Sequence, residues 1–210
     1  MGLYRTAGKR GLDLLIAGTM LLALSPLLLA VALAVRLKLG SPIFFLQQRT
    51  GKGRKPFSII KFRTMLDAMD AEGNPLPDHV RLTRFGRFLR DWSLDELPSL
   101  WNIMRGDMGA VGPRPFIHQY DELYTPAEAR RFEVRPGVTG WAQVRGRNAI
   151  SWQEKFALDV WYVDHLGFLL DMRILWETAF GVLTRRGINA DEASTMPRFT
   201  GSAPTEPTDS

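Results

Sequence analysis

The sequence predicts an α+β protein, mainly helical, with an N-terminal re-entrant membrane helix, a short β-hairpin and a compact helical cytoplasmic domain that lies on the membrane face. Three observations support this prediction. An apolar run without charge spans positions 14–35, two strand-like segments flank a glycine-rich turn near position 52, and helical periodicity dominates from position 81 to position 183. The 210 residues are 45% hydrophobic and 23% charged, which indicates one main folded domain rather than a disordered chain.

The apolar run can be interpreted in three ways. As one straight helix it would be about 33 Å long, enough to cross a hydrocarbon core of about 30 Å. A signal peptide is the second interpretation, because basic residues precede the run and Ala32-Leu33-Ala34 resembles a cleavage site. The third is a kinked helix that enters and leaves the membrane by the same face, with each half about 17 Å long.

Two features favour the re-entrant helix. Ser25-Pro26 lies in the middle of the run, where proline removes a helix hydrogen bond, and the Ser25 hydroxyl is the nearest partner for a freed carbonyl. Both flanks are basic, and the positive-inside rule places both on the cytoplasmic side, which one spanning helix cannot satisfy. Because proline is tolerated in many spanning helices, a plain anchor stays open. The basic residues are Arg5, Lys9 and Arg10 before the run and Arg36, Lys38 and Arg49 after it.

The rest of the chain is expected to form one hairpin and several helices. Strands at 43–46 and 57–60 would be joined by the turn Gly51-Lys52-Gly53. Thr125 is expected to cap one helix, and Ser151 with Glu154 fits a capping box at the next. Helices are expected at 65–70, 81–91, 97–104, 126–133, 151–166 and 168–183, with loops at 111–118 and 135–148.

The amino-acid composition limits the kinds of reaction and ligand that the protein can support. The net charge of +5 points to an anionic partner, which can be nucleic acid, a phosphorylated substrate or an acidic membrane surface. The absence of cysteine excludes disulfides, thiolate zinc sites and cysteine nucleophiles. The three histidines lie far apart, without metal-ligand spacing. The chemistry must therefore use carboxylates, basic groups and the backbone.

The segment Ser93-Leu94-Asp95-Glu96-Leu97-Pro98 has two interpretations. Ser93 and Glu96 fit a capping box, and sequence physics alone favours this structural role. The same geometry suits a functional carboxylate pair, because free N–H groups at a helix start bind phosphate oxygens and hold an adjacent aspartate ionised. Such an aspartate, ionised near its ordinary pKa of about 3.9, can act as a nucleophile or ligate Mg²⁺.

Basic residues on stiff loops complete the candidate site. Arginines beside glycine or proline suit phosphate binding, although each one alone is a weak signal. The segments concerned are Lys61-Phe62-Arg63, Gly112-Pro113-Arg114-Pro115 and Arg145-Gly146-Arg147-Asn148. No P-loop, dinucleotide-binding or α/β-hydrolase motif is present in the sequence.

Taken together, the motifs resemble those of the bacterial sugar transferases, the monotopic polyprenyl-phosphate phosphoglycosyl transferases, and in particular the small enzymes that begin bacterial N-glycan assembly. The resemblance runs from about Tyr4 to about Phe199. The motifs are Ser25-Pro26, Lys61-Phe62-Arg63-Thr64-Met65, Ser93-Leu94-Asp95-Glu96-Leu97-Pro98, Gly106-Asp107-Met108, Val111-Gly112-Pro113-Arg114-Pro115 and Arg135-Pro136-Gly137-Val138-Thr139-Gly140-Trp141-Ala142-Gln143-Val144.

The resemblance implies transfer of a sugar-1-phosphate from a UDP-sugar to undecaprenyl phosphate, with release of UMP. It implies that Asp95 is the nucleophile, forms a covalent phosphosugar intermediate and lies beside Mg²⁺, while Glu96 assists. The family's phosphate- and nucleotide-binding residues would correspond to Lys61, Arg63, Arg90, Arg114 and Arg147, and Asn148 is expected beside them.

The resemblance also implies a place in the cell. Residues 1–40 are expected to form the re-entrant helix, residues 41–200 the catalytic domain and residues 201–210 a disordered tail. The protein would be monotopic in the bacterial inner membrane, with its catalytic domain facing the cytoplasm. Membrane lipid is an expected partner and nucleic acid is not.

Two other classes of protein remain as alternatives. A membrane-anchored binding protein could use the basic surface to hold nucleic acid or anionic lipid, but this does not explain the Asp-Glu pair. A non-catalytic scaffold of the same glycan pathway would not need Asp95.

Overall fold

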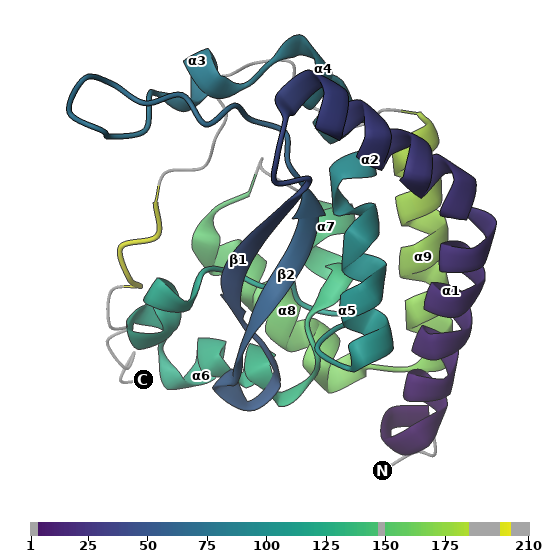
Figure 1. Cartoon of the computed structure of the whole chain (residues 1–210). Coiled ribbons are helices and arrows are strands. Elements are labelled where there is room, and N and C mark those ends of the chain that lie inside the picture. Colours follow the sequence, from purple (N-terminus) through teal and green to yellow (C-terminus); the bar gives the residue numbers. More distant parts are fainter. Residues whose placement is uncertain (1–3, 147–149, 185–197, 203–210) are drawn as a thin grey trace.

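A computed structural model describes residues 4–146, 150–184 and 198–202 (Figure 1). A two-stranded antiparallel sheet lies at the surface in front of the helices (Figure 1), and a second, smaller sheet is buried. The strands are β1 Phe44–Thr50, β2 Pro56–Phe62, β3 Gly109–Val111 and β4 Gly137–Thr139. The helices are α1 Lys9–Ala23, α2 Ser25–Leu39, α3 Asp78–Arg81, α4 Arg84–Asp91, α5 Leu100–Arg105, α6 Pro126–Ala129, α7 Trp141–Arg145, α8 Trp152–His165 and α9 Phe168–Leu183, with a π-helical turn at Tyr4–Gly8 and 3₁₀ turns at Lys52–Arg54, Leu94–Ser99, His118–Leu123 and Arg130–Glu133.

The N-terminal apolar run forms two helices that meet at Ser25-Pro26. The helical stretches Tyr4–Ala23 and Ser25–Leu39 are bent by 64° relative to each other. The Ser25 hydroxyl donates to the Leu22 carbonyl at 2.8 Å, so it satisfies a carbonyl near the break as expected. Across the described ranges no single helix is long and apolar enough to cross a membrane, whereas this bent pair qualifies by combined length and composition.

The first of these two helices is fixed to the protein interior by a group of polar contacts, which we call the anchor network (Lys9, Asp13, Asp171, Tyr4 and Tyr162). Lys9 Nζ lies 2.8 Å from Asp171 Oδ2, and the hydroxyls of Tyr4 and Tyr162 donate to Asp171 at 2.5 and 2.7 Å. Asp13 accepts from the backbone N–H of Ala110 in β3 at 2.9 Å. Lys9, Asp13 and Asp171 are buried. Moving α1 away from the domain would therefore leave buried charges without their partners.

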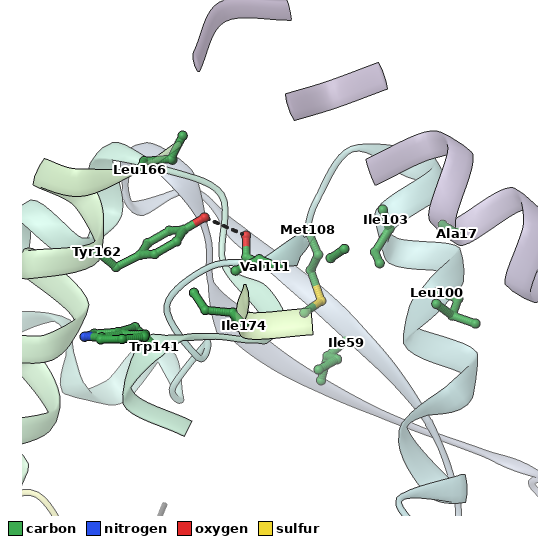
Figure 2. Packing of buried hydrophobic residues seen from close by; sticks show 11 residues of the cluster. Ala17, Ile59, Leu100, Ile103, Met108, Val111, Trp141, Tyr162, Leu166 and Ile174 are labelled. Atoms are coloured by element: carbon green, nitrogen blue, oxygen red, sulfur yellow. Dashed lines mark hydrogen bonds between the residues drawn. The ribbon is translucent and has the colours of Figure 1, made fainter. Parts of the chain in front are cut away.

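The main hydrophobic core lies between α1, α5, α9 and the small sheet. Figure 2 shows this cluster, in which Tyr162 of α8 reaches the Val111 carbonyl at 3.4 Å while Ile103 of α5 lies beside Ala17 of α1. A second cluster joins the other half of the bent pair to the domain, because Val31 and Val35 pack with Leu89 of α4 and Phe62 of β2. Both halves of the bent pair thus pack on the globular part.

Several expected elements are confirmed. Strands β1 and β2 form the hairpin with Leu46 opposite Ile60 and are longer than expected. Helices α8 and α9 match the expected ranges, and capping boxes are present at Thr125 and Ser151.

The helix expected at 65–70 is wrong. The segment is irregular, with Met65 forming a bridge to Leu82, and the Asp70 carboxylate accepts from the backbone N–H of Asn74 at 2.7 Å. Contacts to a distant segment and a side-chain turn replace the helical hydrogen bonds. The helix expected at 81–91 is also interrupted, because Thr83 caps α4 by accepting from the N–H of Gly86 at 3.0 Å.

The loops expected at 111–118 and 135–148 are wrong in part. Strand β3 ends at the start of the first segment, strand β4 and helix α7 lie in the second, and β3 pairs with β4 in parallel. A Cβ atom on Gly137 would lie 2.1 Å from the backbone nitrogen of Gly112, so glycine is required for this close approach. Strands of three residues give no periodic signal in the sequence.

Candidate active site

The carboxylate pair lies on a 3₁₀ turn, and the expected capping box is wrong. Ser93 has φ 53° and ψ 22°, in the left-handed region, and its side chain does not cap the turn. Instead the Ser99 hydroxyl donates to the Glu96 carbonyl at 2.6 Å. Pro98 has no N–H to donate and fits within the turn. The Glu96 side chain is therefore available for other contacts.

Glu96 forms ion pairs with two cations from distant elements. Its Oε1 atom lies 2.6 Å from Lys61 Nζ of β2 and 2.8 Å from Arg114 Nη2, which follows β3. Burial by itself would raise the pKa of Glu96, but the charges and hydrogen bonds of Arg114 and Lys61 outweigh burial and hold this pKa at about 2. Glu96 is therefore ionised at any physiological pH.

Asp95 has the opposite electrostatic environment. It is 9% exposed, and no hydrogen bond joins its carboxylate to another residue in the described part of the chain. Burial raises the pKa of Asp95 to about 6, and the negative charge of Glu96 adds to this effect. The cations of Lys61, Arg90 and Arg114 act in the opposite direction without cancelling it. The sequence-based assumption of an ordinary aspartate pKa is therefore wrong.

Arg90 reaches this site through a close helix contact. A Cβ atom on Gly86 would lie 1.8 Å from the Thr64 carbonyl oxygen, so only glycine lets α4 approach this backbone. Arg90 Nε then donates to Thr64 Oγ1 at 3.1 Å. Gly86, which the sequence did not single out, and Thr64 of the Lys61–Met65 motif therefore position Arg90 near Asp95.

The backbone of Arg114 is positioned by a buried arginine, Arg131, that no sequence motif indicated. Arg131 is 2% exposed, and its Nη2 atom donates to the Arg114 carbonyl at 2.7 Å and to Asp159 Oδ2 at 2.7 Å. Its guanidinium also lies over the ring of Phe116, 4.7 Å from the centroid. The Arg-Arg-Phe-Glu sequence around it resembles any exposed basic helix, so no sequence signal identifies this role.

A cleft opens on the Glu96 side of the carboxylate pair. Three cations line it, and we call it the charged cleft. Its lining residues are Arg49, Ile59, Lys61, Glu96, Ser99, Met108, Arg114, Pro115, Gly137 and Val138. The parallel pairing of β3 and β4 brings the segments of Arg114 and Gly137 to this cleft. A cationic cleft next to Asp95, a carboxylate without a hydrogen-bond partner in the described residues, suits binding and transfer of a phosphoryl group.

Not every predicted site residue reaches the carboxylate pair. Arg63 is buried and donates to the Ser41 carbonyl at 2.8 Å and to Asp67 Oδ2 at 2.6 Å, so these contacts hold the chain entering the hairpin. Arg147 and Asn148 lie outside the described residues. Their predicted roles, like that of Arg63 in binding substrate, stay predictions.

The donor set for a metal ion is sparse. Among the residues that the structure describes, no group of three His, Cys, Asp or Glu side chains could hold a metal ion. Mg²⁺ needs no such group, because it commonly binds through one or two carboxylates plus substrate phosphates and waters. The Asp95 carboxylate, which accepts no hydrogen bond within the described segments, fits that mode of binding.

Comparisons with known proteins agree with this arrangement. The family model of the bacterial sugar transferases matches residues 4–185. The chain is 54% identical over 194 residues to an uncharacterized sugar transferase, EpsL, of Bacillus subtilis, covering 92% of this chain and 96% of EpsL.

Two further relatives carry more specific names. The exopolysaccharide production protein ExoY of Sinorhizobium fredii is 40% identical, over 85% of this chain and 87% of that protein. A UDP-glucose:undecaprenyl-phosphate glucose-1-phosphate transferase of Caulobacter vibrioides is 40% identical, over 84% of this chain and 70% of that protein. With the family model matching most of its length, the chain belongs to the bacterial sugar transferase family.

Proposed function

We propose that the protein transfers a sugar-1-phosphate from a UDP-sugar to undecaprenyl phosphate and releases UMP, as the first membrane step in assembly of a bacterial glycoconjugate such as an exopolysaccharide. The observation that carries this proposal is the buried Asp95 directly before Glu96, which pairs with Lys61 and Arg114 and lines the charged cleft. The name of the Caulobacter vibrioides relative describes this reaction with UDP-glucose, and that of ExoY a role in exopolysaccharide production.

In the first half of the reaction, Asp95 acts as the nucleophile. A carboxylate oxygen attacks the phosphorus that carries the sugar, the bond from this phosphorus to the bridging oxygen breaks, and its electron pair leaves with UMP. With a pKa of about 6, Asp95 is mostly ionised near pH 7 and more basic than an ordinary aspartate. It needs no partner base.

The neighbouring charges complete the first half of the reaction. Glu96 holds Lys61 and Arg114 in place, and their cations stabilise the negative charge on the phosphoryl oxygens. Asp95 and the substrate phosphates would hold Mg²⁺, which would supply further neutralisation of the phosphate charge.

In the second half, a phosphate oxygen of undecaprenyl phosphate attacks the same phosphorus and the Asp95 carboxylate leaves. The kinetics are therefore ping-pong, and UMP is released before the acceptor binds.

The acceptor is a lipid, and the bent helix pair provides a way to reach it. We propose that the bent pair enters the cytoplasmic leaflet of the inner membrane with its exposed leucine surface and returns, while its other surface stays packed on the globular part, which lies on the cytoplasmic side. Leucines on the outer surfaces of both helices are exposed, among them Leu22 (79%) and Leu37 (76%). The basic residues on both flanks of the pair favour the same side of the membrane.

Cysteine labelling tests this topology, because the native chain has no cysteine. Cysteines introduced at Gly2 and Gly201 should both be protected from a periplasmic reagent in intact cells. Labelling at position 2 alone would show that the pair spans the membrane. Pro26→Leu should relax the bend and shift some molecules towards spanning.

The reaction itself is tested with purified protein in detergent, Mg²⁺, undecaprenyl phosphate and a panel of UDP-sugars. We expect UMP release with one or a few of these sugars. The variant Asp95→Asn should release none. If no UDP-sugar yields UMP while the protein binds nucleic acid or anionic vesicles, the alternative of a binding protein replaces this proposal.

A further inference from the structure

Arg49 is a cation of the charged cleft that the proposed reaction has not yet used. The end of β1 fixes its backbone, since Arg49 forms an antiparallel bridge with Ile117, and the N–H of Thr50 donates to the Phe116 carbonyl at 3.2 Å. This chain segment directly follows Arg114-Pro115. Backbone pairing therefore holds Arg49 against the segment that directly follows Arg114-Pro115.

Only some of the hydrogen-bond donors of the Arg49 side chain have partners. Its Nη2 atom donates to Gln47 Oε1 at 2.5 Å, and its Nη1 atom makes a long contact of 3.4 Å with the Pro115 carbonyl. Its Nε atom is buried and has no hydrogen-bond partner within the described segments. Because a buried guanidinium N–H without a partner is costly, this geometry favours a ligand oxygen at the cleft.

The charges of the cleft lead to the same conclusion. Arg49, Lys61 and Arg114 line it together, and Glu96 is the carboxylate that faces them. Burial lowers the pKa of Arg49 to about 10, and the positive charge of Arg114 adds to this effect. Since Glu96 already accepts from both Lys61 and Arg114, the cleft has an excess of positive charge that a second anion would neutralise.

We propose that Arg49, together with Arg114, binds the nucleotide phosphate of the UDP-sugar, the one that leaves as UMP. This inference rests on the proposed function. The phosphate that carries the sugar must meet Asp95, and of the two carboxylates it is Glu96 that lines the cleft. The second phosphate of the donor therefore extends past Glu96 towards Arg49.

This placement assigns Arg49 a part in the reaction. When the bond between the two phosphates breaks, the electron pair stays on UMP and its phosphate gains one negative charge. A cation already fixed beside that phosphate stabilises the charge as it develops. Arginine suits this position because its planar donors can reach two phosphate oxygens at once.

Binding of UMP and of uridine to the full-length protein in detergent tests the proposal without turnover. The ratio of the two dissociation constants isolates the contribution of the phosphate. Arg49→Gln should weaken UMP binding by about 10- to 100-fold and leave uridine binding unchanged, because one charged hydrogen-bond donor is lost. Lys52→Gln removes a charge from the exposed hairpin turn and is the matched control, with both affinities unchanged.

Each other outcome would overturn the inference. Arg49→Gln could bind UMP as tightly as the wild type, could lose UMP and uridine affinity equally, or the wild type itself could bind UMP no better than uridine. If Arg49→Gln does not fold, Arg49→Lys serves instead, with a severalfold loss for UMP alone expected. A wild-type protein that releases no UMP from any UDP-sugar would refute the proposed function separately.

Discussion

The anchor network and the charged cleft are both clusters of partly buried charge, and they are built in opposite ways. In the anchor network one lysine faces two carboxylates, and hydroxyl and backbone donors complete the set around Asp13 and Asp171. In the charged cleft three cations face Glu96, the neighbouring Asp95 accepts no hydrogen bond within the described residues, and a buried donor of Arg49 has no partner there.

The difference separates charges that hold the fold from charges that await a ligand. Removing one member of a satisfied network leaves a buried charge without a partner, so the damage falls on stability. Removing an unsatisfied charge relieves repulsion or desolvation, so the fold survives and the damage falls on binding or chemistry. The following predictions test this contrast, from the largest expected effect to the smallest.

Asp95→Asn should reduce turnover to background, because an amide cannot form the acyl phosphate. The same substitution should raise the melting temperature at pH 7–8, since it removes a buried charge whose pKa lies at about 6. UMP release and thermal denaturation in detergent measure the two effects. Asp91→Asn, at the end of α4, is the matched control and should change neither. An Asp95→Asn protein that melts earlier would place Asp95 in a structural role.

Lys9→Met should lower stability and leave turnover almost unchanged, the reverse of Asp95→Asn. It leaves Asp171 and Asp13 buried without their cation and should cost about 3–5 kcal/mol of stability. Turnover per folded molecule at low temperature should stay within a few-fold of the wild type. Adding Asp171→Asn to Lys9→Met should restore part of the lost stability, because the stranded charge is then removed. Loss of turnover without loss of stability would contradict the structural role of the network.

Arg114→Ala should lower turnover by about 10²- to 10³-fold, because it removes a donor to the phosphoryl oxygens. Stability should fall far less than activity, and less than in Lys9→Met, because Lys61 still pairs with Glu96. Arg114→Lys should restore activity poorly, since lysine cannot make the planar two-point contact. A loss of stability in step with activity would instead assign Arg114 to the structural network around Arg131.

The smallest effect is on the pH dependence of stability. The raised pKa of Asp95 means that its ionisation opposes folding, so it removes stability as the pH rises from about 4 to about 6. The lowered pKa of Glu96 contributes stability above its unfolded value of about 4.5 that is lost as the pH falls towards 2. The free energies of unfolding of Asp95→Asn and wild type should therefore diverge above pH 4, by about 3 kcal/mol at pH 7. Parallel curves would exclude the raised pKa.

The sequence predicted the elements whose signals are local. The hairpin, the long helices, the N-cap at Thr125, the capping box at Ser151 and the break at Ser25-Pro26 each depend on residues close together in the chain. The pairing of β3 with β4 was missed because strands of three residues give no periodic signal and because the pairing joins segments that are distant in the sequence.

The site was predicted in part for the same reason. The Asp-Glu pair and Arg114 lie in recognisable motifs, whereas Arg131 and Arg49 act through contacts to segments distant in sequence. Ser93 shows how a local signal can fail: its capping box matched by spacing, but Lys61 and Arg114 bind the Glu96 side chain more favourably than the helix start could.

The most direct test of the central claim is mass spectrometry of the protein after incubation with a UDP-sugar and Mg²⁺ in the absence of undecaprenyl phosphate. The proposed reaction predicts a phosphosugar adduct on the peptide that contains Asp95, formed together with an equal amount of UMP. Asp95→Asn should give neither product. An adduct on another residue, or turnover by Asp95→Asn, would contradict the assignment of Asp95 as the nucleophile.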